Sequence, residues 1–305
     1  MRRFLIGQLL TLALLFQSTM GYSQGLMTLG AGSVAAPQAV VTGLPLDGIT
    51  TGIKAAYSTR KLLTAYAGSA IQVQETTGNT TTNIGFVANV LDTATLSTFC
   101  SGKTCKAITW YDQSGGGFDH TIGIGNAPTI FQSGAVNVIN SKPALLFSLA
   151  QFLSNASLSA NPINTLYENA VISWTSGTGG IVGASGSGGM EWRVDGPTIS
   201  LLKAQTAGIG TSTLSLTAAT GAVVEAQYNS SSGAFSFWLN RATAGTGTSA
   251  QTLTATTSQI GIGSGISEPF NGSIGEVILY DLVGGIPGAS QSSITLNQKA
   301  YWGTP

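Results

Sequence analysis

The sequence has few charged residues. Lysine, arginine, aspartate and glutamate make up 8% of its 305 residues, and 12 basic side chains balance 12 acidic ones. No basic stripe is present that would neutralise a phosphate backbone, so the composition argues against a nucleic acid partner. A nearly neutral chain with 43% hydrophobic residues is also unlike a disordered protein. We therefore expect a folded protein with a large apolar core.

Histidine is scarcer still. The single histidine, His120, has no second metal ligand near it in the sequence, and there is no serine motif at a strand-to-helix turn. A zinc site or a Ser-His-Asp triad is therefore not supported. No aspartate-rich run indicates calcium, and the glycine-rich segments do not open a helix with a lysine, as phosphate-binding loops do. We expect no metal and no cofactor, and we expect His120 in a loop.

Long hydrophobic runs are absent after the first residues. Arg2 and Arg3 precede an apolar stretch from Phe4 to Phe16, and small and polar residues follow. About 20 apolar residues are needed to span a bilayer, so the pattern predicts a cleaved signal peptide over residues 1–23. The alternative is a membrane anchor that is not cleaved. We expect a secreted or periplasmic protein that has no contact with the membrane after cleavage.

The only two cysteines, Cys100 and Cys105, lie in the sequence F-C-S-G-K-T-C. In an exported protein, two thiols separated by four residues predict a small disulfide loop. Two sulfurs and one distant histidine cannot complete the four ligands of a zinc site. Because the loop is short, we expect the bridge to fix a local turn rather than the whole fold.

What the sequence has in abundance is glycine, with 41 residues, and short segments of β-forming residues. Turn residues separate these segments, which is the pattern of an antiparallel β-sandwich. The predicted strands are 71–74, 108–111, 144–147, 169–174, 190–194, 198–202, 222–228, 234–239, 259–262 and 273–280. Helical spacing predicts short helices over 58–67, 91–99 and 290–302. Residues 24–50 are expected to form an irregular lead-in and residues 51–305 one sandwich domain.

Four motifs occur in order between residues 55 and 120. They are Y-S-T-R, then A-Y-A-G-S-A-I-Q-V-Q, then the cysteine loop, then W-Y-D-Q-S-G. In this order they resemble the start of the catalytic domain of the arabinofuranosidase B family. The resemblance implies an all-β, concanavalin-A-like antiparallel sandwich (a jelly roll) with a few short helices, and the cysteine loop resembles one of that family's disulfides. The same block also resembles the laminin-G-like modules of bacterial and phage surface proteins.

The resemblance also identifies where catalytic carboxylates would stand. A retaining glycosidase needs two carboxyl groups about 5 Å apart. The segment from Gly188 to Glu191 matches one that precedes the family's catalytic strand, but Leu202, Ala204 and Gly265 occupy the expected acidic positions. The hydrolytic pair is therefore expected to be lost. If the chain is catalytic, its carboxylates are displaced from the family positions, and Glu191 and Glu268 are the candidates.

Three further residues are candidates for sugar binding. Trp192 offers an aromatic face beside Glu191, and Asp112 and Gln113 offer hydrogen-bonding groups at the end of an aromatic strand. Each has a structural alternative, because most tryptophans of a sandwich lie in its core and an Asp-Gln-Ser-Gly sequence also forms an Asx-type turn. Arg60 is expected to pair with a carboxylate rather than to bind ligand.

These observations leave three functions. The first is a secreted, carbohydrate-binding sandwich related to the arabinofuranosidase B catalytic domain that has lost the hydrolytic pair. The second is an active α-L-arabinofuranosidase, a glycoside hydrolase that uses displaced carboxylates. The third is a purely structural surface domain, which no motif of the sequence favours. In the first two cases the expected partner is carbohydrate, either an arabinose-containing polysaccharide or a surface glycan.

Overall fold

Alternating apolar and polar residues fold the chain into antiparallel β-structure. The computed structural model describes residues 43–49, 51–148, 150–184, 188–203, 207–254, 257–262 and 268–305. The predicted signal peptide and residues 24–42 of the lead-in lie outside these ranges. Residues 43–49 form turns, and Leu46 is fully buried, so the described end of the lead-in packs on the domain.

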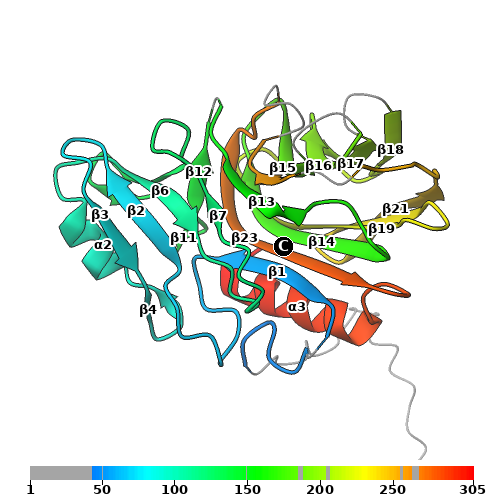
Figure 1. Ribbon diagram of the computed structural model, residues 1–305, viewed down its shortest axis with the longest axis horizontal. Helices are drawn as coiled ribbons and strands as arrows, with labels where there is room; N and C mark the ends of the chain where they lie inside the picture. The colour runs from blue at the N-terminus through cyan, green and yellow to red at the C-terminus, as the bar shows by residue number, and fades with distance from the viewer. Residues whose placement is uncertain are drawn as a thin grey trace, which may run out of the picture. The chain divides into compact units, whose positions relative to one another are not determined.

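One layer of the sandwich is built around two long neighbouring strands (Figure 1). All its pairings are antiparallel, and β12 extends the edge beyond β1. In spatial order the layer contains β1 (Ile53–Ser58), β23 (Gly272–Leu282), β14 (Thr165–Trp174), β19 (Gly221–Asn229), β20 (Ala234–Leu239) and β21 (Ala242–Thr248), with β12 (Leu145–Phe147) on β23.

The second layer faces the first and runs from one edge hairpin to another. In spatial order it contains β18 (Ala207–Thr211), β17 (Thr198–Lys203), β16 (Met190–Asp195), β15 (Thr178–Ala184), β22 (Thr257–Ile260), β13 (Leu153–Ser159), β7 (His120–Thr121), β6 (Cys105–Trp110), β2 (Ile71–Glu75) and β3 (Thr81–Ile84). The strand β8 (Thr129–Gln132) pairs with both β6 and β12 and so joins the two layers, and β9 (Ala135–Val136) pairs with β8.

Short elements complete the fold outside the two layers. These are the hairpins β4 (Phe86–Val87) with β5 (Val90–Leu91) and β10 (Val138–Ile139) with β11 (Lys142–Pro143), and the helices α2 (Thr93–Phe99) and α3 (Gly288–Trp302). Apolar side chains from both layers form one core, and α3 lies against the outer face of the first layer (Figure 1). The predicted antiparallel β-sandwich with a few short helices is confirmed.

Two of the three predicted helices are confirmed and one is wrong. The Asp92 side chain accepts a hydrogen bond from the Thr95 amide and so caps α2, and α3 covers the segment predicted near the C-terminus. The segment 58–67 is not helical. Ser58 ends β1, and the Leu62 amide donates to the Gln113 side chain instead of to a helical carbonyl. In this segment, tertiary hydrogen bonds outweigh the helical preference that the spacing of its apolar residues indicates.

A buried polar cluster lies between the first layer and α3. The Glu276 carboxylate is fully buried and accepts from Arg60 Nε at 2.8 Å, from Ser58 Oγ at 3.1 Å, and from the side chains of Gln298 at 3.0 Å and Trp302 at 3.2 Å. Arg60 is itself 4% exposed. The expectation that Arg60 pairs with a carboxylate is confirmed, and this ion pair links β1, β23 and α3.

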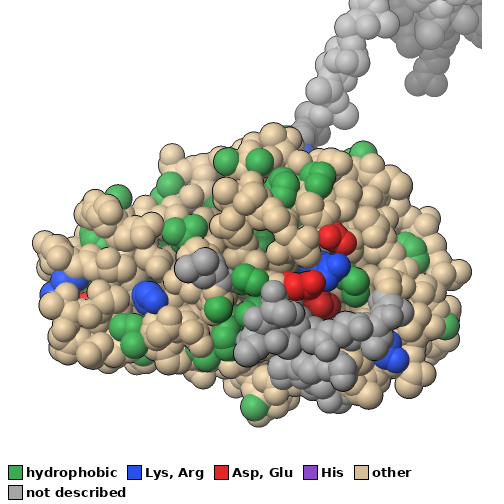
Figure 2. All heavy atoms as spheres, turned by 90° about the horizontal axis from the view of Figure 1, so that it is seen from above, with side chains coloured by type: hydrophobic (Ala, Val, Ile, Leu, Met, Phe, Trp, Pro, Cys, Tyr) green, Lys and Arg blue, Asp and Glu red, His purple; other side chains and the backbone are tan. Residues whose placement is uncertain are grey.

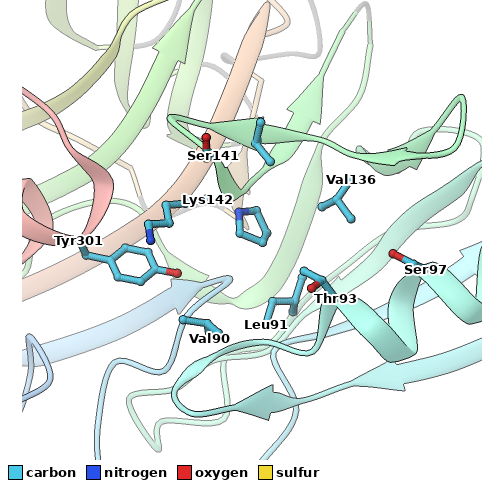
Figure 3. A pocket seen from close by; sticks show the side chains of 10 residues that line it. Val90, Leu91, Thr93, Ser97, Val136, Ser141, Lys142 and Tyr301 are labelled. Carbon is cyan, nitrogen blue, oxygen red and sulfur yellow. The ribbon is translucent and has the colours of Figure 1, made fainter.

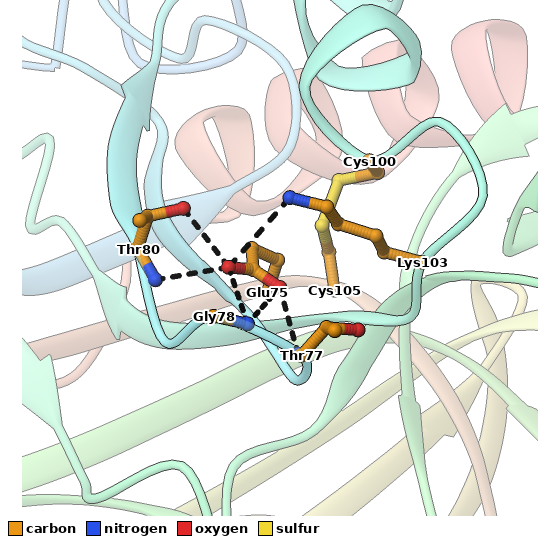
Figure 4. The surroundings of a disulfide bond; sticks show 7 residues. All are labelled: Glu75, Thr77, Gly78, Thr80, Cys100, Lys103 and Cys105. Atoms are coloured by element: carbon orange, nitrogen blue, oxygen red, sulfur yellow. Dashed lines mark hydrogen bonds and ion pairs between the residues drawn. A yellow bond between two sulfur atoms is a disulfide. The ribbon is translucent and has the colours of Figure 1, made fainter.

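The predicted disulfide between Cys100 and Cys105 is present and closes the turn after α2 (Figure 4). Beside it, the Glu75 carboxylate at the end of β2 accepts hydrogen bonds from the backbone amides of Thr77, Gly78 and Thr80. These amides lower the pKa of Glu75 to about 2 because they stabilise its charged form. The carboxylate thus holds the turn between β2 and β3.

We expect Glu75→Gln to lower the melting temperature at pH 7 and to have little effect near pH 2. A depressed folded-state pKa gives stability that is present above the unfolded pKa, and this stability is lost as the pH falls from about 4.5 to about 2. Thermal unfolding of both proteins at a series of pH values measures the difference. An equal difference at pH 2 and pH 7 would show that the charge of Glu75 does not hold the turn.

Candidate functional site

Asp112 and Gln113 form a structural turn. The Asp112 Oδ1 atom accepts from the amides of Ala56 and Ser114, each at 2.9 Å. The Gln113 side chain is fully buried, and its Oε1 accepts from the Leu62 amide at 2.8 Å. The alternative interpretation of this motif as an Asx-type turn is confirmed. The side-chain oxygens of both residues are occupied by backbone amides, so neither residue belongs to the candidate ligand site.

His120 is a core residue. It lies in β7 opposite Trp110, not in a loop as predicted, and its side chain is fully buried against the Tyr57 ring. Its Nε2 atom is 3.2 Å from Ser258 Oγ. Burial lowers the pKa of His120 to about 3, so the imidazole is neutral at physiological pH. Within the described ranges, no group of three or more histidine, cysteine or acidic side chains is placed to hold a metal ion.

The strand β16 has one face in the core and one face outside it. Met190, Trp192 and Val194 alternate into the core, and Trp192 is fully buried. The prediction that Trp192 stacks on a sugar does not fit this placement, because strand alternation turns its ring away from Glu191. Glu191, Arg193 and Asp195 occupy the other face, which is the outer face of the second layer.

Arg193 is the centre of a cluster of acidic side chains on that face. Its Nη2 atom is 3.2 Å from Asp195 Oδ2, and its Nη1 atom is 3.7 Å from Glu191 Oε1. The same Nη1 also bonds Glu268 Oε2. Figure 2 shows a face of the molecule on which acidic side chains gather around a basic one among mostly uncharged neighbours.

The structure therefore brings together the two displaced carboxylates that the sequence suggested. Glu191 is 2% exposed and Glu268 is 35% exposed on the side chain, so one lies at the base of the cluster and the other at its rim. Partial burial disfavours the charge of Arg193, but the carboxylates of Glu191, Glu268 and Asp195 favour it and raise the pKa of the guanidinium. Arg193 thus stays positively charged between them.

A row of residues in register crosses this face beside the cluster. Gln259 on β22 pairs with Gly183 on β15, Gly183 pairs with Glu191, and Glu191 pairs with Leu202 on β17. Residues paired in this way share one face of an antiparallel sheet. Gly183 has no side chain, so the row places an amide and a carboxylate on either side of a bare backbone position.

Gln259 is a candidate site residue that the sequence did not indicate. It is 5% exposed, and its Oε1 atom has no hydrogen-bond partner among the described residues. A buried polar atom of this kind is costly unless a ligand or water binds it. The only signal in the sequence was its alternation with Ile260 in a predicted strand, which shows that Gln259 faces out of the core but not what lies beside it.

The arrangement is suited to binding hydroxyl groups. Carboxylates, an amide and a guanidinium together offer the donors and acceptors that a neutral sugar requires. Hydrolysis places further demands, because one carboxyl must donate a proton and the reacting carbon must lie between the two groups. Here one guanidinium nitrogen, Arg193 Nη1, contacts both Glu191 and Glu268.

The structure describes one of the three positions at which the family pattern led us to expect acids. Leu202 is half-buried next to Glu191 on the neighbouring strand. Ala204 and Gly265 lie outside the described residues. Directly paired residues have Cβ atoms about 5 Å apart, so Glu191 is one strand away from the place of Leu202.

Comparison with known proteins confirms the resemblance found in the sequence. Residues 47–144 match the family model described as alpha-L-arabinofuranosidase B, catalytic. A probable alpha-L-arabinofuranosidase B of Aspergillus flavus is 37% identical over 92 residues, which are 28% of this chain and 18% of that protein. An arabinofuranosidase/B-xylosidase of Trichoderma koningii is 36% identical over 94 residues, which are 29% of this chain and 19% of that protein.

The fold is shared over a longer part of the chain. An arabinofuranosidase solved with arabinofuranosyl-alpha-1,2-xylobiose superposes with a TM-score of 0.65 at 19% identity, covering 84% of this chain and 64% of that structure. A GH54 α-L-arabinofuranosidase soaked with a cyclic sulfate inhibitor gives a TM-score of 0.64 at 19% identity, covering 83% and 63%. The chain is therefore related to the arabinofuranosidase B catalytic domain and has its sandwich fold.

The sequence matches do not reach the candidate site. The sequence matches to the curated relatives span less than a fifth of those proteins, and the family model ends at residue 144. The cluster around Arg193 and the row from Gln259 to Leu202 lie beyond that residue. In the described part of the chain, no helix is long and apolar enough to cross a membrane.

Proposed function

We propose that this chain is a carbohydrate-binding β-sandwich, related to the arabinofuranosidase B catalytic domain, in which the hydrolytic carboxylate pair has been lost. The observation that carries the proposal is the contact of Arg193 with both Glu191 and Glu268. A cation held there leaves hydrogen-bonding groups for a ligand but no carboxyl that is free to act as an acid. The ligand class that the relationship favours is an arabinofuranosyl-containing saccharide.

Polar groups on the outer face of β15, β16 and β22 make up the proposed ligand site. Gln259 Oε1 accepts from a sugar hydroxyl, and the carboxylates around Arg193 accept from others. Gly183, which has no side chain, stands between them in the row. The contacts are polar and need no aromatic platform, which agrees with the burial of Trp192 in the core.

One observation favours hydrolysis as the second candidate function. Glu191 lies directly beside Leu202, the position at which the family resemblance places an acid, so a shifted nucleophile would stand only one strand away. In that case Glu268 is the second carboxyl, and substrate binding must first separate both groups from Arg193. The chain would then be an α-L-arabinofuranosidase with displaced carboxylates.

Export from the cytoplasm is part of the proposal. Its support is the basic head and the short apolar stretch of the first residues, together with the disulfide between Cys100 and Cys105. Disulfides persist in oxidising compartments and are rare in the cytosol. A secreted or periplasmic location would bring the protein into contact with extracellular polysaccharide.

We expect Gln259→Ala to weaken the binding of arabinofuranosyl-α-1,2-xylobiose by about 3–10-fold. One neutral hydrogen bond contributes roughly 0.5–1.5 kcal/mol, which corresponds to this range. Isothermal titration calorimetry of the wild type and the variant measures the change. The matched control is Gln72→Ala, because Gln72 lies on β2 and bonds the Asn83 side chain away from the site. Equal weakening by both substitutions, or wild-type protein that does not bind, would contradict the proposed site.

A further inference from the structure

A groove lies apart from the candidate sugar site, between the end of α3, the start of α2, β5 and the β10–β11 hairpin (Figure 3). Its volume is about 390 Å³, which is within the range of sites for small organic ligands. None of the residues discussed for the sugar site lines it. Any ligand of this groove is therefore independent of the proposed function.

Half of the residues that line the groove are apolar. Val90, Leu91, Val136, Val138 and Pro143 line it. Val90 is 37% exposed and Val138 is 47% exposed, and these are two of only five large hydrophobic residues that are exposed among the described residues. A ligand that fills the groove would remove this apolar surface from water, which favours its binding.

The polar part of the lining carries a single charge. Lys142 and Tyr301 lie together at one end of the groove, and Thr93 and Ser97 lie near its other end on α2 (Figure 3). No acidic residue is among the groups that line it. Asp92, next to the lining residues, turns its carboxylate to the amide and hydroxyl of Thr95. The charge of the groove is therefore positive, and it favours an anion.

The Tyr301 hydroxyl is a second hydrogen-bonding group at the Lys142 end of the groove. Its oxygen is buried and has no partner among the described residues. Burial raises the pKa of Tyr301 to about 12, so the hydroxyl is protonated and can donate. The ring itself is in contact with two cations, because Lys142 Nζ lies 4.8 Å and Arg60 Cζ 4.5 Å from its centre. A sugar stacking on this ring would compete with them.

We propose that this groove binds a small carboxylate with an apolar body, such as an aromatic monocarboxylate. The apolar body lies against Val90, Val138 and Pro143, and the carboxylate accepts hydrogen bonds from Lys142 and Tyr301. A neutral sugar would leave its hydroxyls against the valines, and a cation would meet Lys142. The positive charge of Lys142 and the apolar lining together favour an anion with an apolar body.

The test is a titration of the full chain with phenylacetate. Ligand-observed NMR and the backbone amide shifts of the protein report binding. Three comparisons accompany it: phenylacetamide, which lacks the charge; glucuronate, which has the charge but a polar body; and the variant Lys142→Met. The matched control is Lys106→Met, because Lys106 donates to the backbone of residues 124 and 125 outside the groove. The comparison of phenylacetate with phenylacetamide uses wild-type protein, so it does not depend on the folding of a variant.

We expect phenylacetate to bind and to shift amides of the β10–β11 hairpin and the end of α3. Phenylacetamide should bind the wild type about tenfold more weakly than phenylacetate, and Lys142→Met should weaken phenylacetate binding by a similar factor. This factor is the lower end of what one charge-assisted hydrogen bond contributes. Lys106→Met should leave binding unchanged. Phenylacetamide binding as well as phenylacetate, equal loss in both lysine variants, or tighter binding of glucuronate would each overturn the proposal.

Discussion

Replacing Arg60 with methionine is expected to lower the free energy of unfolding by about 3–5 kcal/mol, because removal of one partner from a buried ion pair leaves the other charge uncompensated. The Glu276 carboxylate would remain fully buried with only neutral donors around it. The ion pair also joins β1, β23 and α3, so its loss affects the attachment of the helix to the sandwich. Urea unfolding at pH 7 measures the change.

Two further variants separate charge from packing. Arg241→Met removes an exposed arginine in a hairpin and should change stability by less than about 1 kcal/mol. The double variant Arg60→Met/Glu276→Gln removes the uncompensated charge and should recover part of the loss. If Arg60→Met costs no more than Arg241→Met, or if the double variant is no better than the single one, the ion pair does not contribute as described.

Replacing Arg193 with methionine is expected to lower the free energy of unfolding by about 1.5–3 kcal/mol at pH 7, the range for hydrogen bonds to charged groups. The substitution leaves Glu191, Glu268 and Asp195 on one face without their cation. Salt screens the repulsion between these carboxylates, so the loss of unfolding free energy should be smaller at high than at low ionic strength. Urea unfolding at pH 7 in low and in high salt measures the difference.

The matched control for this prediction is Asp195→Asn. The Asp195 side chain is 43% exposed, and exposed ion pairs contribute about 0–1 kcal/mol. The asparagine variant should therefore be close to the wild type in stability. If Arg193→Met loses the same stability in low and in high salt, lost packing rather than charge is responsible.

Much of the fold could be predicted because local patterns determine it. Alternation of apolar residues identified the strands, and helical spacing identified α2, which the Asp92 side chain caps. The segment 58–67 was misread because its apolar spacing is helical, whereas the Leu62 amide bonds Gln113, 51 residues away. Local spacing carries no information about such a partner.

The site could be predicted less well, for the same reason. Glu191 and Glu268 were selected as carboxylates, but their meeting at Arg193 depends on a contact across 75 residues. Trp192 was selected for its neighbours in the sequence, and strand alternation places it on the opposite face from them. Gln259 was missed because its importance arises from its register with Gly183 and Glu191, which only the sheet pairing shows.

The most direct test of the central claim, sugar binding without hydrolysis, is a titration with 4-nitrophenyl α-L-arabinofuranoside in which binding and release of 4-nitrophenolate are followed in the same sample. Amide shifts of the protein report binding, and absorbance reports turnover. The account predicts saturable shifts on β15, β16 and β22 with no release above the rate without protein. Release that is abolished by Glu191→Gln, in a variant that still binds the glycoside, would contradict it and establish the displaced carboxylates as catalytic.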